Sequence, residues 1–351
     1  MIKKIYASIK RKIIRIYEKR KFYQEKKLEL ERKYNQNKHN IWFIGSAHYD
    51  NIGDLAISEA TIEFVTKNIE NANIIEIRLC DYYKYYKAIK KIIKPKDLII
   101  MQGGGNMGFA YFDAEFNRRE VIKHFPKNKI IIFPSTIDYG TSLREKIEFK
   151  NSIKIYNKHK NLTICAREEK SYELMKKIYK NVLLVPDIVL SLENKELERK
   201  NDRKEIIICL REDIEKTNQA VGLKKEFLKF KNVIYTDNIA KEKNIGINLR
   251  KKIFNEKLNE LSKGKVVITD RLHVMIFCTI IEIPCLFIDN SNKKLSGTYN
   301  KWIKNSCNYV KELDLTKNID EQINKLTSTK HTNKNNLQKE FINLISELKM
   351  E

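Results

Sequence analysis

The chain has 351 residues, which is enough for two domains of ordinary size. Its mean hydropathy of −0.52 and its 32% of charged residues argue against an integral membrane protein, and the longest apolar run, 273–288, is interrupted by Glu282 and Pro284. The net charge of +24 favours anionic partners, although a lysine-rich composition explains part of it. Because no zinc-finger spacing, RNP-type strand or helix-turn-helix accompanies the charge, we predict no nucleic-acid partner.

The six cysteines are spread along the chain without a CxxC pair, which predicts reduced, buried thiols and neither disulfides nor a zinc site. They are Cys80, Cys165, Cys209, Cys278, Cys285 and Cys307. The N-terminal residues MIKKIYASIK are charged and lack the apolar core of a signal peptide. We therefore expect a cytoplasmic protein with no bound metal.

Residues 1–38 form a basic segment with a predicted helix. Lys and Arg outnumber Asp and Glu by thirteen to four over residues 1–33, so this stretch carries +9 of the net charge. Its apolar residues recur at near-helical spacing, at Ile2, Ile5, Tyr6, Ile9, Ile13, Ile16 and Tyr17. One interpretation is peripheral contact with an anionic membrane at its inner face. The other is a solvated helix whose apolar stripe packs on the body of the protein.

Between residues 39 and 195, short apolar runs alternate with helical stretches, which is typical of a parallel, doubly wound sheet. The strands are expected at 41–46, 73–79, 97–102, 129–135, 162–168 and 182–190. The helices between them are expected at 55–69, 82–93, 142–159 and 170–179. This part is predicted to be the N-terminal, acceptor-side domain.

A polar, charged stretch over 193–204 marks the expected linker, and a second alternating set occupies 204–315. Its strands are expected at 205–212, 232–237, 265–273 and 284–289. The tail, 316–351, is rich in Lys and Asn and ends in a predicted helix. The fold class is thus predicted to be α/β, with two Rossmann-like domains facing across a cleft and an added basic N-terminal helix. Ligands in such sheets lie at the carboxyl ends of the strands.

The loop after the first expected strand is unusually polar. His48, Asp50 and Asn51 crowd it, and Asp54 is placed to cap the helix that follows. An ordinary strand–turn–helix connection explains Asp54 but not the other three residues. We therefore predict that this loop binds a ligand or takes part in catalysis.

A run of three glycines, Gly103, Gly104 and Gly105, precedes Asn106 after the strand at 97–102. Glycines allow a ligand to approach the main chain closely, or let amides surround an anion. We place this run, like the loop around His48 and Asn51, on the acceptor side of the cleft. The run lacks the GxGxxG pattern, so a dinucleotide site is not indicated.

The sequence Asp270-Arg271-Leu272-His273 lies between the apolar residues 265–269 of an expected strand and a predicted helix. Free amides and the helix dipole favour an anion at a helix N-terminus. Arg271 adds a planar guanidinium suited to carboxylate or phosphate, and His273 adds a proton donor that works near neutral pH. This motif is the strongest candidate for a functional site.

Other charged residues follow predicted strands. Arg211 is expected to point into the cleft from the second domain, although an ion pair with Glu212 or Asp213 is the alternative. Arg167 and Asp187 are similar, and a buried structural ion pair is the simpler explanation for each.

The segments GSAHYDNIGDLAI, MQGGGN, CAREEKSYE, VPDIVL, CLRED and TDRLHVMIFCTI, in this order over about residues 41–290, resemble the polysaccharide pyruvyl transferase family. The resemblance implies a fold similar to GT-B glycosyltransferases. It implies transfer of pyruvate from phosphoenolpyruvate to a sugar, as a ketal, during synthesis of exopolysaccharide or cell wall polysaccharide. Phosphoenolpyruvate is then a co-substrate and no cofactor is expected. The donor-binding residues would be Arg211, Arg271, Leu272 and His273.

The chemistry that the resemblance implies gives each residue a role. His273 is expected to protonate the enol carbon or to assist the leaving phosphate. Asp54, Asp50 or His48 would orient or deprotonate a hydroxyl of the sugar or lipid-linked glycan acceptor. A glycosyltransferase with a nucleotide-sugar donor fits the same scaffold and remains an alternative. A non-catalytic basic protein that binds membranes or nucleic acid is a further alternative, but it leaves the strand-end residues unexplained.

Overall fold

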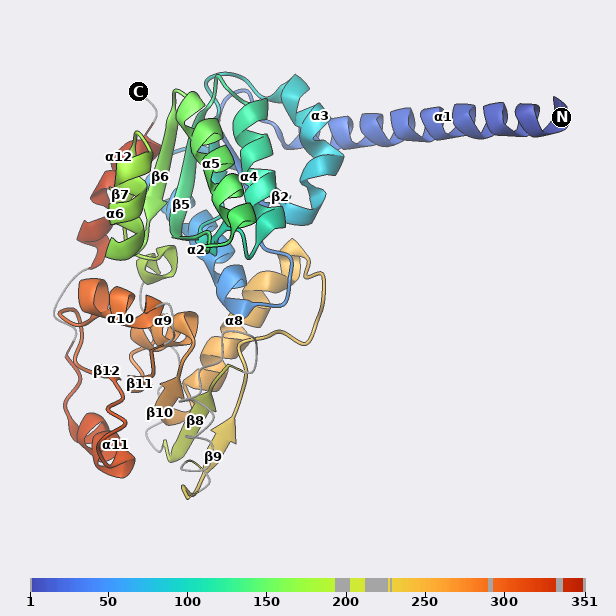
Figure 1. The fold of residues 1–351 in the computed structure, drawn as a ribbon. Helices are drawn as coiled ribbons and strands as arrows, with labels where there is room; N and C mark the ends of the chain where they lie inside the picture. Colours follow the sequence, from blue (N-terminus) through green and yellow to red (C-terminus); the bar gives the residue numbers. More distant parts are fainter. Residues whose placement is uncertain are drawn as a thin grey trace.

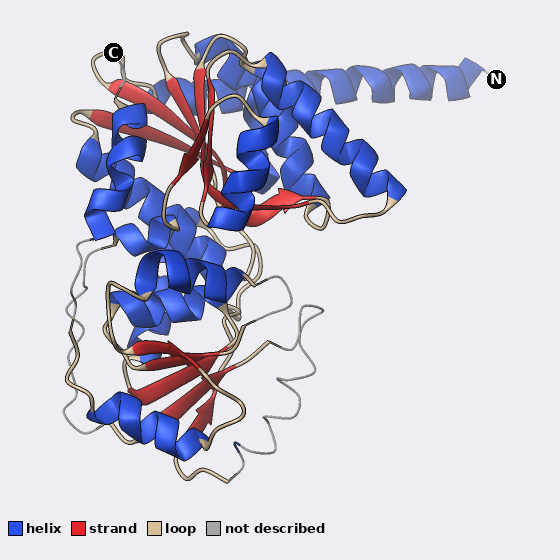
Figure 2. Cartoon of the chain, turned by 60° about the vertical axis from the view of Figure 1, so that its left-hand side comes forward, coloured by secondary structure: helices blue, strands red, loops and turns tan. Residues whose placement is uncertain are grey.

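The computed structural model describes residues 2–192, 203–211, 227, 229–289, 293–332 and 337–349. Two parallel sheets lie one above the other, each flanked by helices (Figure 1 and Figure 2). This arrangement confirms the predicted α/β class with two Rossmann-like domains. The predicted linker at 193–204 lies mostly outside the described residues.

The first sheet has the strand order β2-β1-β3-β5-β6-β7, and β4 pairs with β5. Its central strands are unbroken apolar runs buried on both faces, as parallel strands between two layers of helices must be. The strands are β1 (His39–Ser46), β2 (Ala72–Arg78), β3 (Leu98–Met101), β4 (Gly104–Gly108), β5 (Lys129–Asp138), β6 (Leu162–Ala166) and β7 (Val182–Leu184).

The helices around this sheet begin at polar caps. Asn51 caps α2 by accepting from the amide of Gly53 at 3.0 Å, so the sequence-based assignment of this role to Asp54 is wrong. Ser142 and Glu145 form a capping box at α5. The helices are α1 (Ile2–Lys33), α2 (Ile52–Asn68), η1 (Leu79–Asp81), α3 (Tyr82–Ile92), α4 (Phe112–His124), α5 (Leu143–Lys158), α6 (Glu169–Ile178) and η2 (Ile188–Ser191).

The second sheet has the strand order β12-β11-β10-β8-β9, again all parallel. Its strands are β8 (Glu205–Cys209), β9 (Val233–Tyr235), β10 (Gly264–Thr269), β11 (Cys285–Phe287) and β12 (Val310–Glu312). Its helices are α8 (Ile247–Leu261), α9 (Leu272–Ile280), α10 (Lys294–Thr298), η3 (Tyr299–Ile303) and α11 (Ile319–Ser328).

The C-terminal tail divides between the two domains. Helix α11 packs with the second sheet, whereas η4 (Leu337–Phe341) and α12 (Ile342–Leu348) return to the first domain (Figure 1). There the ring of Phe341 lies 5.3 Å from that of Phe64, and Glu347 accepts from Thr163 Oγ1 at 3.0 Å. The second domain is therefore bracketed in sequence by segments of the first.

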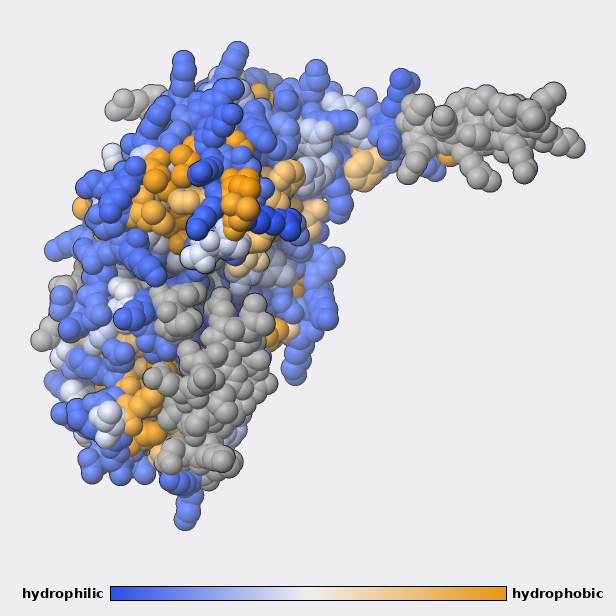
Figure 3. Space-filling model, viewed as in Figure 1, coloured by the Kyte–Doolittle hydropathy of each residue, from blue (hydrophilic) through white to orange (hydrophobic). Residues whose placement is uncertain are grey.

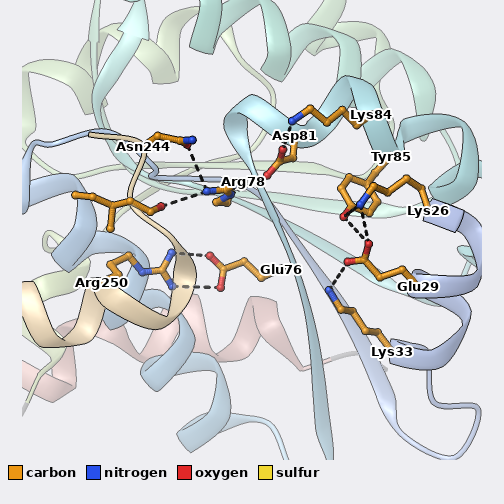
Figure 4. A network of polar contacts seen from close by, with 11 residues as sticks. Lys26, Glu29, Lys33, Glu76, Arg78, Asp81, Lys84, Tyr85, Asn244 and Arg250 are labelled. Atoms are coloured by element: carbon orange, nitrogen blue, oxygen red, sulfur yellow. Dashed lines mark hydrogen bonds and ion pairs between the residues drawn. The ribbon is translucent and has the colours of Figure 1, made fainter. Parts of the chain in front are cut away.

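Polar contacts join the domains beside α2. Arg250 of α8, with its side chain 1% exposed, pairs with Glu76 of β2 at 2.6 Å (Figure 4). It also pairs with Glu59 of α2 at 2.6 Å. Arg78 donates to the main-chain oxygen of Ile245 at 3.3 Å. A buried guanidinium with two carboxylates fixes orientation because an unpaired charge there would be costly.

Two strand predictions need correction. The expected strand at 182–190 ends at Leu184, because Pro186 has no amide to donate and Asp187 caps η2 by accepting from Val189 at 3.1 Å. The glycine run after β3 is not a free loop, since Gly104–Gly108 forms β4 beside β5.

The face seen in Figure 3 is mostly hydrophilic, with an apolar area over α4 and α5 and a smaller one on the second domain. Phe116, Leu143 and Ile147 are exposed on these two helices. Cys80 is exposed and the other five cysteines are buried, all as free thiols. In the described part of the chain, no helix has the length and apolar character to cross a membrane.

Candidate active site

A cavity of about 90 Å³ lies where the carboxyl ends of the two sheets meet. The first domain contributes Tyr49, Asn51, Asp54, Gly105, Asn106, Tyr111 and Arg167. The second domain contributes Arg211, Asn238, Arg271, Leu272, His273 and Lys294. Three arginines, a lysine and a histidine thus surround the cavity with one carboxylate, an arrangement suited to a small anion.

The N-terminus of α9 forms the second-domain wall. Strand β10 ends at Thr269, whose hydroxyl accepts from the amide of Arg271 at 3.0 Å. Arg271 is the N-cap residue, in an extended conformation, so the first amides of α9 lack partners within the helix. Its guanidinium lies 3.1 Å from the carboxylate of Asp237, which is 46% exposed. This wall therefore combines a helix dipole with a fixed cation.

A buried charge cluster supports His273 from behind. Asp187 is fully buried and accepts from Arg167 Nη1 at 2.8 Å, while Nε2 of His273 lies 3.5 Å from the same carboxylate. Burial alone would raise the pKa of Asp187, but the neighbouring His273 and Arg167, with the hydrogen bond from the Val189 amide, hold it well below the usual value. Asp187 is therefore an ionised group that fixes the position of the imidazole.

Gly53 fixes the other side of the imidazole. A Cβ atom at this position would lie 2.3 Å from Nδ1 of His273 and 2.6 Å from its Cγ. Only glycine lets α2 of one domain come this close to α9 of the other. Gly53 is thus a packing residue of the site.

Polar side chains of the first domain surround Asp54. Arg118 donates to Oδ1 of Asn106 at 2.8 Å. Asn106 and Tyr49 line the cavity together with Asp54. Burial raises the pKa of Asp54, and the charges of His273 and Arg167 oppose this rise. Asp54 therefore keeps its proton to a higher pH than an ordinary aspartate does.

Arg211 is held by its main chain at the end of β8. Its amide donates to Oδ1 of Asp270 at 2.8 Å, and Thr269 donates to the main-chain oxygen of Cys209 at 2.7 Å. These bonds lock the ends of β8 and β10 together, so that Arg211 and Arg271 both reach the same cavity. Burial raises the pKa of Asp270, while its bond to the Arg211 amide lowers it.

The family model for polysaccharide pyruvyl transferase matches residues 51–292, which include most of these lining residues. The chain belongs to the polysaccharide pyruvyl transferase family. The match spans both domains, from the start of α2 to the residues before α10.

Relatives of this family member occur in a bacterium and a yeast. The chain is 32% identical over 283 residues to General stress protein 30 of Bacillus subtilis, covering 79% of this chain and 82% of that protein. It is 28% identical over 286 residues to Pyruvyl transferase 1 of Schizosaccharomyces pombe, covering 75% of this chain and 69% of that one.

Solved structures are similar to this chain to different degrees. A Klebsiella pneumoniae protein described as functionally uncharacterized superposes with a TM-score of 0.50 at 23% identity, over 78% of this chain and 91% of that one. A UDP-GlcNAc 2-epimerase of Methanocaldococcus jannaschii gives a TM-score of 0.47 at 13% identity, over 88% and 99% of the two chains.

Eight of the residues predicted from the sequence meet at the cavity of this family member. They are Asn51, Asp54, Gly105, Asn106, Arg211, Arg271, Leu272 and His273. The other four, His48, Asp50, Gly103 and Gly104, do not line it.

These four residues have other roles. The main-chain oxygens of His48 and Asp50 accept from Ile245 and Ala240, each at 2.7 Å, so the loop is attached to the second domain along this edge. A Cβ on Gly103 would lie 2.5 Å from the main-chain oxygen of Pro134, and Gly104 has a φ of +109°. Both glycines therefore serve backbone packing.

The sequence did not single out four lining residues: Tyr49, Tyr111, Asn238 and Lys294. Tyr49 lies in the polar loop after β1, between His48 and Asp50. Asn238 and Lys294 carry no local signal, because their place depends on how β9 and β11 lead into the cleft. Arg167 forms a buried ion pair with Asp187, as the sequence suggests. It also lines the cavity.

Within the described residues, no group of three or more His, Cys, Asp or Glu side chains could hold a metal ion. The ionisable groups that line the cavity include the arginine, lysine, histidine and aspartate side chains named above.

Proposed function

We propose that this protein transfers the pyruvyl group of phosphoenolpyruvate to a sugar and closes it into a cyclic ketal. The observation that carries the proposal is the convergence of Arg211, Arg271 and His273 on one cavity, opposite Asn51 and Asp54. Membership of the pyruvyl transferase family supports the reaction class. We propose a polysaccharide or its lipid-linked precursor as the acceptor, modified in the cytoplasm.

The donor side suits phosphoenolpyruvate in charge and size. Arg211, Arg271 and Lys294 can neutralise a carboxylate and a phosphate that lie three carbons or less apart. The volume of about 90 Å³ is small compared with the ~300–1,000 Å³ of pockets for drug-sized ligands. This favours a compact acid over a nucleotide sugar.

The reaction needs one proton at carbon and two new C–O bonds. In our proposal His273, held by Asp187, protonates C3 of the enol, and a sugar hydroxyl attacks C2. A second hydroxyl then displaces phosphate from C2, so that the C2–O bond to phosphate breaks. The two hydroxyl protons balance the proton added to C3 and the proton carried away by phosphate.

The acceptor side has groups suited to sugar hydroxyls. Asp54 lies across the cavity from Arg271, and we assign it as the group that orients or deprotonates the hydroxyl. Asn51 and Asn238 line the cavity beside it, and Oδ1 of Asn238 has no hydrogen-bond partner among the described residues. A buried acceptor of this kind is suited to a hydroxyl donor.

A ligand screen followed by a product assay tests this function. Phosphoenolpyruvate should raise the melting temperature, because a ligand that binds only the folded state stabilises it. Incubation with phosphoenolpyruvate and glycans that carry neighbouring hydroxyls should release phosphate and yield a pyruvylated product by mass spectrometry. A rise in melting temperature with a nucleotide sugar, and none with phosphoenolpyruvate, would reject the proposal in favour of glycosyl transfer.

A further inference from the structure

A second hollow lies at the opposite end of the first sheet. It has a volume of about 1,190 Å³ and is lined by the loops at the amino ends of β1, β3, β5, β6 and β7, together with the end of α12. Six exposed lysines line it: Lys38, Lys96, Lys127, Lys160, Lys180 and Lys349. We call these six residues the amino-edge lysines.

The amino-edge lysines are not neutralised by nearby carboxylates. Within the described parts of the chain, no carboxylate lies within ion-pairing distance of any of the six. The two acids of the hollow have other partners: Asp97 accepts from Trp42 and Tyr34, and Glu347 pairs at 3.2 Å with Lys129, a further lysine of the hollow. The hollow therefore presents uncompensated positive charge to solvent.

Helix α1 leaves the body at the same edge. Its last turns are anchored, since Lys26 donates to Tyr85 Oη at 2.9 Å and Leu30 is fully buried (Figure 4). The rest of the helix projects away from the domain in both ribbon views (Figure 1 and Figure 2). Ile14 and Tyr17 lie on this projecting part and are 45% and 68% exposed. Thirty-two residues of helix are about 48 Å long.

We propose that the amino-edge lysines and α1 form one docking face for an anionic membrane surface. Lysines on the hollow would lie against lipid headgroups, and α1 would rest in the interface with its apolar residues toward the acyl chains. The inference stands on the charge and exposure of this face, and goes beyond the proposed function.

Two features favour a membrane over other occupants. A soluble polyanion would satisfy the lysines but would leave the apolar residues of α1 in water, whereas a bilayer satisfies both. A second copy of this chain would bring its own +9 segment to the same place, so that like charges would face each other. Charge complementarity and the exposed apolar surface of α1 therefore both favour a membrane as the partner.

The proposal has a geometric consequence for the cavity. Strand β1 runs from the docking face to the loop before α2, the helix whose first turn contains Asp54, and its eight residues span about 26 Å. The cavity would therefore face away from the bilayer, open to a glycan that extends from it.

The test uses the full-length protein and vesicles of phosphatidylcholine with or without phosphatidylglycerol. The protein should sediment with the anionic vesicles only, and binding should weaken steeply with salt. Replacing Lys96, Lys127, Lys160 and Lys180 by Gln should lower the affinity by roughly fivefold per lysine. A matched variant with Lys251, Lys263, Lys311 and Lys325 of the second domain changed to Gln should bind as the wild type does.

Three further measurements complete the test. Ile14→Ser and Tyr17→Ser together should remove the binding that survives at high salt, and both variant sets should keep the wild-type response to phosphoenolpyruvate. Equal binding to neutral vesicles, or equal losses in the two lysine variants, would overturn the proposal. So would capture by soluble polyphosphate without vesicle binding, or a dimer that Ile14→Ser and Tyr17→Ser dissolve.

Discussion

The two walls of the cavity differ in chemistry. The second-domain wall carries fixed cations at strand and helix ends, with Arg211, Arg271 and His273 as its main groups. The first-domain wall has one cation, Arg167, which is paired with buried Asp187, and otherwise offers hydrogen-bonding groups such as Asn51 and Asp54. An anion binds to the first kind of surface and a hydroxyl to the second. The comparison shows why neither domain alone is expected to carry out the reaction.

Removing the imidazole should have the largest effect on turnover. His273→Gln is expected to lower kcat by ~10²–10⁴-fold, which is the usual contribution of a general acid. Donor binding should change much less, because the arginines remain. The matched control is His39→Gln, at the far end of β1, where kcat should be unchanged. A His273→Gln enzyme with normal kcat would remove this residue from the mechanism.

Breaking the contact between the domains should cost the most stability. Arg250→Met leaves Glu59 and Glu76 without their shared cation, and loss of one partner of a buried pair typically costs ~3–5 kcal/mol. Urea denaturation measures this change. Lys252→Met on the same helix, whose side chain is 72% exposed, should change the free energy of unfolding by less than about 0.5 kcal/mol. Similar losses in both variants would show that the ion pair does not hold the domains.

A methyl group on Gly53 should disturb the contact between α2 of the first domain and His273 of the second. Gly53→Ala is expected to displace His273 and to lower kcat by ~10²-fold, the order of loss for a misplacement of about 1 Å. Gly246→Ala is the control, since a Cβ there meets no atom within 4 Å. Steady-state kinetics of both variants test this. Unchanged kcat in Gly53→Ala would mean that the imidazole can move without loss.

The smallest expected effect concerns pH. Because the pKa of Asp187 is depressed in the folded state, its ionisation contributes stability that is present above its unfolded pKa of about 3.9 and is lost as pH falls through the folded value. The stability advantage of the wild type over Asp187→Asn should therefore persist at pH 4–7 and shrink only below pH 4. Urea titrations across this range measure it, and an advantage that already vanishes at pH 5–6 would contradict an ionised, paired Asp187.

The second-domain wall could be predicted from the sequence more fully than the first. Arg271 and His273 follow a clear strand and open a clear helix, and a strand-to-helix turn fixes where its residues point. The apolar runs likewise located the long central strands. The apolar pattern predicts a strand over 182–190, but β7 ends at Leu184, before Pro186. The proline is a local signal for this end, and the prediction gave more weight to the apolar pattern.

The first-domain wall depends on contacts that no local pattern contains. Asp50 and Asn51 are adjacent, yet only Asn51 lines the cavity, because the main chain of Asp50 is bound to Ala240 of the other domain. The close approach of Gly53 to His273 likewise arises from domain packing. Sequence patterns therefore located the polar loop, but which of its side chains reach the cavity is decided by tertiary structure.

Titration of phosphoenolpyruvate into the wild type, Arg271→Ala and Arg271→Lys tests the central claim most directly. The wild type should bind, and Arg271→Ala should weaken binding by about 30- to 4,000-fold, since loss of a charge-assisted contact to a buried anion costs ~2–5 kcal/mol. Arg271→Lys should fall between them, because it keeps the charge but not the planar guanidinium. Equal affinity in a folded Arg271→Ala protein would contradict the assignment of the donor site.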